Sequence, residues 1–201
     1  MQTRMCPDNM TWDQAEVIAD NLLIRFLKLE IKRPITEFML DHNRDNGVEF
    51  TILKMGSYNI SLQLKYENKS TIIRLSQPGA VLFPEEKVVN EVAAMRFLTD
   101  QTSIPIPFIL ESGTKQERPL ELSPFIIMDY IKHQTKMYDA LNTPGCPIEE
   151  RLDPNIDESK LDMLYGQLEG ILLQLSNPSL TCIGSLSQID DFTWEVTRRP
   201  L

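Results

Sequence analysis

The chain has 201 residues and a formal net charge of −9, from 20 Lys and Arg against 29 Asp and Glu. Hydrophobic residues make up 42% and charged residues 24% of the sequence. These proportions are typical of a folded globular protein and exclude a collagen, a disulfide scaffold and a wholly disordered chain. The acidic balance argues against nucleic acid as the main partner, because phosphate contacts need clustered Lys and Arg.

Nothing in the sequence predicts membrane insertion or secretion. No run approaches the roughly 18 apolar residues that span a bilayer, and Met1–Met10 is polar and lacks the apolar core of a secretory signal. The three cysteines, Cys6, Cys146 and Cys182, are odd in number and too widely spaced for a zinc knuckle or a redox pair. They predict free thiols in a reducing compartment, so we expect a cytoplasmic protein without a membrane partner.

The N-terminal region is predicted to be helical. Apolar residues recur at helical spacing over Thr11–Glu30, and Thr11 with Gln14 has the form of a capping box. A second, short helix is expected over Pro34–Leu40, and the polar stretch Asp41–Gly47 ends it.

The hydrophobic period then changes to that of strands. Ile60–Tyr66 alternates apolar and polar side chains, the pattern of a half-buried strand. The other expected strands are Val48–Leu53, Ser70–Leu75, Phe108–Leu110 and Pro124–Ile131. A helix is expected over Pro84–Thr99, because Pro84 suits a first helical turn and the acids after it favour the positive end of the helix dipole. The order predicts an α+β fold, a five-stranded antiparallel sheet with a helix inserted after the third strand.

The last third of the chain is predicted to be a loop followed by one strong helix. Prolines, a glycine and many charges between residues 142 and 159 are typical of a linker or surface loop. Ser159–Leu175 has the spacing of an amphipathic helix with leucines on one face, and Thr181–Leu201 is expected to be irregular.

Two features of the sheet region carry chemical information. A glycine, Gly56, lies between the first two strands, where it lets the backbone turn and its N–H groups approach an anion; a plain hairpin is the alternative. Arg74 lies near the end of the third strand, and Glu91 shares an apolar stripe of the next helix, where an unpaired charge is costly. We predict that Arg74 and Glu91 form an ion pair, with a purely structural pair as the alternative to a functional one.

Taken in chain order, these features resemble the nucleotide-binding lobe of the protein-kinase-like superfamily, and more closely the aminoglycoside-phosphotransferase-like family in its fungal form. The stretches that carry the resemblance are Lys54–Asn59, Thr71–Leu75, Asn90–Leu98, Ile104–Pro107, Phe125–Ile131, Ile183–Leu186 and Trp194–Leu201. The resemblance implies a helical extension (1–47), a nucleotide-binding lobe (48–132), a linker (133–160) and the start of a truncated helical C-terminal lobe (161–201). Of the two lobes of the family, only the N-terminal one would be present.

The resemblance also implies a site for ATP. The turn that covers the phosphates would be Gly56, Ser57, Tyr58 and Asn59. Arg74 would hold the α/β-phosphates and Glu91 would position it. The exit strand would offer backbone hydrogen bonds to the adenine from Met128, Asp129, Tyr130 and Ile131. The implied activity is transfer of phosphate from ATP to a small hydroxylated acceptor, whose identity the sequence does not indicate.

The chain departs from the family pattern in several ways. Arg74 stands where kinase-type lobes usually have Lys, which binds phosphate as a point charge rather than a fork. The turn has one glycine rather than three. Neither His42 nor His133 begins the catalytic His-x-Asp-x-x-x-x-Asn loop, and Asp191-Phe192-Thr193 lacks the glycine of the metal-binding Asp-Phe-Gly motif. We therefore expect no catalytic or metal-binding residue in this chain, and magnesium would need the missing lobe.

Two other interpretations stay open. In the reading given so far, the chain is an inactive ATP-binding half, which we expect to be truncated at Leu201. The second reading is a non-catalytic interaction module. The second depends on the missing lobe and on the apolar face of the Ser159–Leu175 helix, which needs cover, although packing within the chain is the usual role of such a face. A third possibility is an unrelated α+β domain without a nucleotide site.

Overall fold

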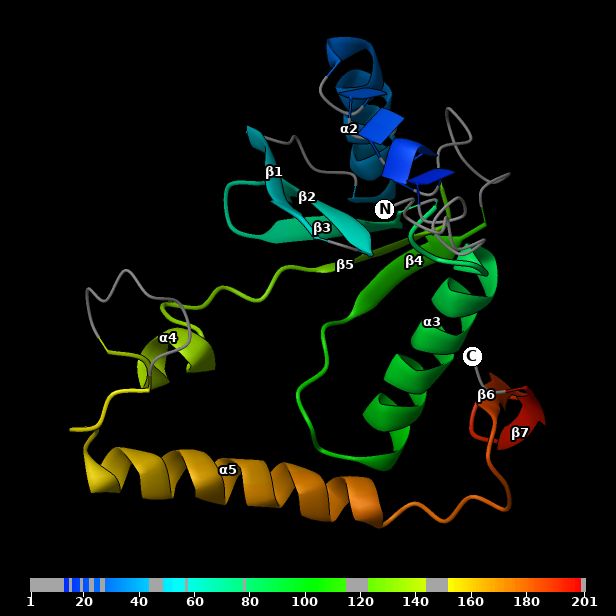
Figure 1. Ribbon diagram of the computed structural model, residues 1–201. Helices are drawn as coiled ribbons and strands as arrows, with labels where there is room; N and C mark the ends of the chain where they lie inside the picture. The colour runs from blue at the N-terminus through cyan, green and yellow to red at the C-terminus, as the bar shows by residue number, and fades with distance from the viewer. Residues whose placement is uncertain are drawn as a thin grey trace, which may run out of the picture.

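A computed structural model describes residues 13–14, 16–18, 20–21, 24–25, 28–43, 49–56, 58–77, 79–114, 123–143 and 152–199. Its elements, in chain order, are α2 (Leu29–Asn43), β1 (Glu49–Met55), β2 (Asn59–Lys65), β3 (Ser70–Ser76), α3 (Pro84–Gln101), β4 (Ile109–Gly113), β5 (Phe125–Asp129), α4 (Met137–Leu141), α5 (Glu158–Ser176), β6 (Ser185–Gln188) and β7 (Trp194–Arg198) (Figure 1). None of the helices, among the residues described, is long and apolar enough to cross a membrane.

The first five strands form one antiparallel sheet in the order β1-β2-β3-β5-β4. The helix α3 follows β3 in the chain, as the order of sequence patterns predicted. β4 extends beyond the expected Phe108–Leu110, because the polar stretch Glu111-Ser112-Gly113 pairs with the apolar strand β5. The prediction of an α+β fold with a five-stranded antiparallel sheet and an inserted helix is therefore confirmed.

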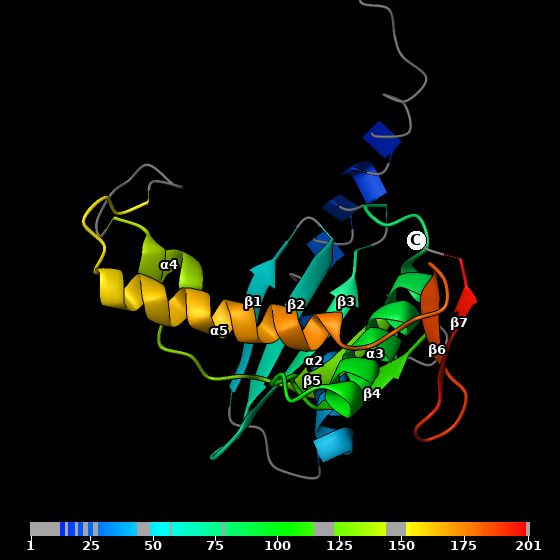
Figure 2. The same cartoon turned by 90° about the horizontal axis from the view of Figure 1, so that it is seen from below.

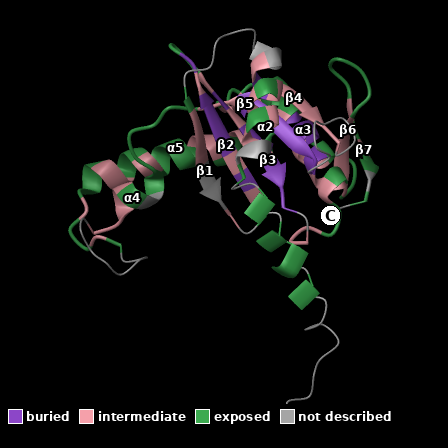
Figure 3. Ribbon diagram, turned by 90° about the horizontal axis from the view of Figure 1, so that it is seen from above, coloured by how far each residue is buried: buried purple, intermediate pink, exposed green. Residues whose placement is uncertain are grey.

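The sheet has an apolar core on each face. On one face α2 packs against β2, β3 and β5 in a cluster whose fully buried members include Ile35, Met39, Ile60, Leu62, Ile73 and Phe125. On the other face α3 packs against β5 in a smaller cluster of Val88, Val92, Ile126 and Met128. Figure 3 shows this burial concentrated in the middle strands of the sheet. The strand β5 is buried on both faces, which explains why its sequence is a continuous apolar run.

The helix α2 is longer than the sequence predicted. Pro34, which was expected to open the helix, lies inside it, where its missing N–H removes one backbone bond. Ile31, Ile35 and Met39, spaced by one turn, are all buried against the sheet. This packing compensates for the proline. Of the helix expected over Thr11–Glu30, the described residues between 13 and 25 are helical and exposed, whereas Thr11 lies outside the described residues.

The last third contains α5 and a small hairpin. α5 begins at its cap Asp157, whose carboxylate accepts the Ser159 N–H. In the predicted linker the chain forms the short helix α4 and an isolated bridge between Asn142 and Leu152. α5 lies at the opposite end of α3 from the sheet (Figures 1 and 2) and contacts the segment that follows α3, where Oε1 of Gln174 accepts the Ser103 N–H at 2.7 Å.

The prediction of irregular structure over Thr181–Leu201 is wrong. Within that range β6 and β7 pair as an antiparallel hairpin. The Asp190 carboxylate accepts the N–H groups of Phe192 and Thr193 and so closes the turn. The hairpin packs on α3, with the Trp194 ring 5.7 Å from that of Phe97. Such short strands carry little periodic signal, and this contact joins residues far apart in the chain.

Candidate functional site

The centre of the candidate site is the ion pair between Arg74 and Glu91. Strand alternation places Arg74 on the same face of β3 as Ile72, the face that α3 covers. Helical spacing places Glu91 on the face of α3 that carries Val88. Nη2 of Arg74 pairs with Oε1 of Glu91, and their side chains are 25% and 28% exposed. The predicted pairing is confirmed, and it joins the sheet to the inserted helix.

Burial lowers the pKa of Arg74 from its ordinary value. A guanidinium nevertheless stays charged at any physiological pH. The site therefore holds a permanent cation, and one Oε atom of Glu91 fixes one edge of its fork. The Arg74 side chain is only 25% exposed, so an anion bound to its guanidinium would be screened by water less than on an open surface.

The turn between β1 and β2 is tied to itself and to β3. Gly56 donates its N–H to the Asn59 carbonyl at 2.9 Å, and Gln77 donates to the Tyr58 carbonyl at 2.9 Å. A Cβ at Gly56 would lie 3.4 Å from the Asn59 carbonyl oxygen, an ordinary contact, so the turn itself does not demand glycine. Tyr58 is 61% exposed, and Ser57 lies outside the described residues. The N–H of Gly56 is thus used within the turn.

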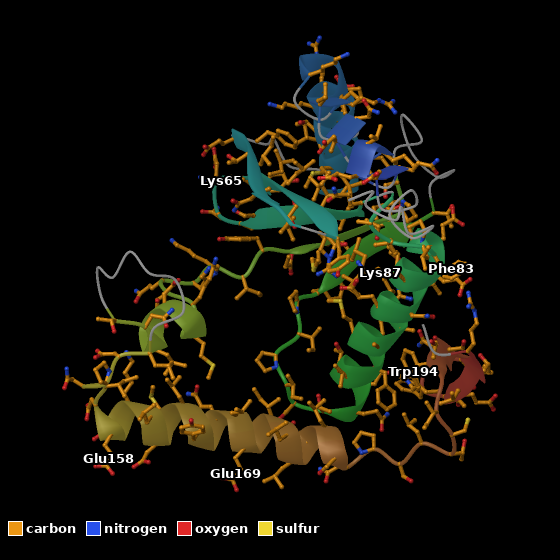
Figure 4. The ribbon with its side chains drawn as sticks, viewed as in Figure 1. Lys65, Phe83, Lys87, Glu158, Glu169 and Trp194 are labelled. Carbon is orange, nitrogen blue, oxygen red and sulfur yellow. The ribbon has the colours of Figure 1, made fainter. Side chains whose placement is uncertain are left out.

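Sequence reasoning missed a second cation, Lys87. Its Nζ donates to Oδ1 of Asn59 at 2.8 Å and so links α3 to the start of β2. The pKa of Lys87 is lowered, first by burial and then by the positive charge of Arg74. Figure 4 shows Lys87 near the first turns of α3, beside the sheet. The signal that could have found it is its spacing, four residues before Glu91 and therefore on the same helical face.

The residues predicted for adenine lie at the end of β5. Met128 is buried and pairs with Ile72, at the same face as the ion pair. Asp129 donates its N–H to the Phe108 carbonyl, and Tyr130 donates its N–H to the Ser70 carbonyl. The remaining predicted residue, Ile131, is 59% exposed, and its carbonyl lies 3.0 Å from Nδ1 of His133. The structure therefore brings Arg74 and Glu91 together and ties Asn59 to Lys87 of the same helix, whereas Asp129 ends β5 and Tyr130 and Ile131 lead away from it.

The residues that the structure describes place no metal centre beside these groups. Among the described residues, no three His, Cys, Asp or Glu side chains come close enough to hold a metal ion. The Asp191-Phe192-Thr193 sequence lies on the exposed turn of the β6–β7 hairpin. The described part of the chain thus holds two neighbouring cations but no cluster of carboxylates of the kind that binds magnesium.

A cavity of about 330 Å³ lies beside α3 but away from the ion pair. It is bounded by α3 on one side and by the end of β4 and the strand β6 on the other, with Val89, Arg96, Gly113 and Leu186 among its lining residues. Its walls contain neither Arg74 nor Glu91, so the candidate site rests on the cluster of charges and not on this hollow.

No protein-family model matches the sequence, and no curated protein matches it. Solved structures do match. An aminoglycoside 2'-phosphotransferase-IIIa in its GDP complex aligns with a TM-score of 0.52 and 15% identity, over 74% of this chain and 42% of that one. The GDP and kanamycin complex of APH(2")-IIia aligns with a TM-score of 0.51 and 15% identity, over 72% of this chain and 42% of that one.

The chain therefore spans less than half the length of these structural neighbours. At 15% identity the likeness shows the fold and not the function. Together with the sheet order and the helix inserted after β3, it shows that the described chain has the fold of a kinase-like N-terminal lobe.

Proposed function

We propose that this chain is the nucleotide-binding half of a cytoplasmic phosphotransferase of the fungal aminoglycoside-phosphotransferase-like type. The observation that carries the proposal is the Arg74–Glu91 ion pair, which joins β3 to α3. A cation on this strand, oriented by an acid of the next helix, is the arrangement that kinase-like lobes use to hold nucleotide phosphates. A nucleotide lobe over residues 48–132 and the beginning of a second lobe after residue 160 fit this proposal.

In this proposal each part of the site has one task. Arg74 binds oxygens of the α- and β-phosphates, and Glu91 orients the guanidinium for that contact. The residues of the β1–β2 turn, from Gly56 to Asn59, cover the phosphates. The nucleobase lies beyond Met128, where the chain leaves the sheet. The structural neighbours were solved with GDP, which supports a nucleotide in general and leaves the choice between ATP and GTP to experiment.

Turnover requires groups that the described residues do not supply. Phosphoryl transfer needs a base for the acceptor hydroxyl and carboxylates for magnesium. Because the described residues hold no metal-ligand cluster, we propose that both come from a second lobe, and that this chain alone binds nucleotide with little or no transfer. The acceptor would be a small hydroxylated molecule that the same lobe selects.

The test is nucleotide binding by the Arg74→Ala variant. Loss of a charge-assisted contact to phosphate should weaken ATP binding by roughly tenfold to a hundredfold in calorimetry. Arg74→Lys should lose less, because it keeps the charge without the fork. The matched control is Arg33→Ala, which removes an exposed arginine from α2 on the opposite face of the sheet.

Equal affinities of wild type and Arg74→Ala for both ATP and GTP would contradict the proposed site. Tighter binding of GTP than of ATP, lost in Arg74→Ala, would keep the nucleotide site and correct only the identity of the base.

A non-catalytic interaction module is the second candidate. The observation that favours it is the surface of α5, none of whose residues is buried in this chain. Light scattering after gel filtration, combined with calorimetry, separates the two candidates. A chain that binds nucleotide, whether monomeric or self-associated, supports the first, and a self-associating chain without nucleotide affinity supports the second.

A further inference from the structure

Lys87 stands in an unusual electrostatic position. Its ammonium donates to the neutral amide of Asn59 at 2.8 Å. Within the described residues no carboxylate lies within 4.0 Å of it, since Glu91, one turn further along α3, pairs with Arg74 instead. A partly buried ammonium next to a neutral amide has lost hydration without gaining an opposite charge.

The surroundings add a second cation. The charge of Arg74 is near enough to disfavour the protonated form of Lys87, in addition to the effect of burial. Arg74 and Lys87 together carry two positive charges against the single negative charge of Glu91. This local excess occurs in a chain whose net charge is −9, so it does not reflect a generally basic surface. Two cations that converge in this way are favourable when an anion lies between them.

The position of Lys87 indicates which part of an anion it would meet. Asn59 follows the β1–β2 turn, and Lys87 is attached to it from the first turns of α3. Arg74 lies further into the sheet, on β3 between Ser61 of β2 and Ile126 of β5. An elongated polyphosphate held by Arg74 would therefore extend under the turn toward Lys87.

We propose that Lys87 is a second phosphate-binding residue, which contacts the terminal phosphate and makes the site prefer nucleoside triphosphates to diphosphates. The proposal rests on the proposed function, because Arg74 must first hold the inner phosphates. Asn59 has the role of a positioning residue: its side-chain oxygen holds the ammonium beneath the turn while no phosphate is bound. Arg74 thus contributes affinity for every nucleotide, and Lys87 contributes discrimination by phosphate number.

The experiment compares ATP, ADP and inorganic tripolyphosphate by calorimetry at constant ionic strength, in wild type, Lys87→Met and Asn59→Ala. Lys87→Met should weaken ATP and tripolyphosphate by roughly tenfold or more and ADP by less than about threefold, because one charge-assisted contact is lost only where a third phosphate exists. Asn59→Ala should retain most of the ATP affinity, since the ammonium remains. Lys65→Met removes an exposed lysine from the other end of β2 and controls for net charge.

The outcomes separate this inference from the proposed function. If wild type binds ATP, and Lys87→Met has the same ratio of ATP affinity to ADP affinity as wild type, the role of Lys87 is overturned and the nucleotide site is left intact. Equal losses of ATP affinity in Lys87→Met and Asn59→Ala, with equal losses of melting temperature, show a merely structural tie and also overturn it. Lys87-dependent binding of tripolyphosphate without binding of any nucleotide supports the anion site and contradicts the proposed function. Binding of neither ligand overturns both.

Discussion

The site has two cations and one carboxylate, and the carboxylate pairs with only one of the cations. Glu91 pairs with Arg74, while Lys87 contacts only the amide of Asn59 among the groups that the structure describes. The Arg74–Glu91 pair could be predicted because each residue lies in a regular element whose period shows which way it faces. Lys87 was missed because its partner Asn59 is the first residue of β2, directly after a turn, and a turn has no period from which the direction of that side chain can be derived.

The position of Lys87 should be measurable as a pH dependence of folding. Its pKa in the folded protein lies below the ordinary value of 10.5, so the unfolded chain binds more protons between those two values. The contribution of this group to the free energy of unfolding therefore rises with pH through that interval. Below the interval Lys87 is protonated in the folded protein, and its full destabilising effect is present. Urea denaturation of wild type and Lys87→Met from about pH 8 upward should show the difference shifting in favour of wild type. Parallel stability profiles would contradict this assignment of cost to Lys87.

Among the elements, the β6–β7 hairpin and α3 form a unit. Near the end of α3, Nε1 of Trp194 donates to Oδ2 of Asp100 at 2.9 Å, and near its start Nη2 of Arg199 pairs with Glu86 at 3.0 Å. The Arg199 guanidinium also lies over the Phe83 ring, 4.4 Å from its centre. The hairpin therefore contacts the helix at both ends, and α3 carries Glu91 between them. Figure 4 shows Trp194 and Phe83 on the hairpin side of α3.

Replacing Trp194 should measure this contact. Trp194→Ala removes the edge-to-face packing on Phe97 and the hydrogen bond to Asp100, and it should lower the free energy of unfolding by about 1–3 kcal/mol for a half-buried ring. Trp194→Phe should recover most of that loss, because it keeps the ring. Phe192→Ala, at a ring that is 82% exposed on the same hairpin, is the matched control. Equal urea midpoints for Trp194→Ala and Phe192→Ala would show that the hairpin does not support α3.

The elements divide by the range of the interactions that form them. All five strands of the main sheet, α3 and α5 could be predicted, because each has a hydrophobic period or a local cap, such as Pro84 at the start of α3. The full length of α2 could not, since it depends on burial of Ile31 and Met39 against strands that come later in the chain. The hairpin could not either, because its partner Phe97 precedes Trp194 by almost half of the chain.

Taken as a whole, the described part of the molecule has a buried core at the sheet and an uncovered apolar surface at α5. Leu172 and Leu173 of α5 are 57% and 59% exposed, and they border a shallow hollow with Tyr165 and Leu168. The helix is held by polar contacts, among them Lys160 Nζ to the Ala140 carbonyl at 2.6 Å. Contiguous apolar surface of this kind is typical of a face that another surface covers.

We expect the chain on its own to self-associate through this face. Light scattering after gel filtration should show a mass that rises with concentration, because α5 has no other apolar cover within the described chain. Leu172→Glu should restore the monomer by placing a charge in the apolar stripe. Gln167→Glu adds the same charge at another exposed position of α5 and should leave the association unchanged. A wild-type chain that stays monomeric at every concentration would contradict this expectation.

The strand β5 has a consequence for how sequences with this fold can change. Its alternate side chains serve different cores, Phe125 and Ile127 toward α2, and Ile126 and Met128 toward α3. Deleting one residue within β5 would exchange the two sets and place each against a cavity shaped for the other. Each outer strand has a register shift, β1 against β2 and β4 against β5, whereas β5 pairs with β3 in an unbroken register. Insertions and deletions of residues should therefore accumulate in the edge strands of the sheet and be selected against in β5.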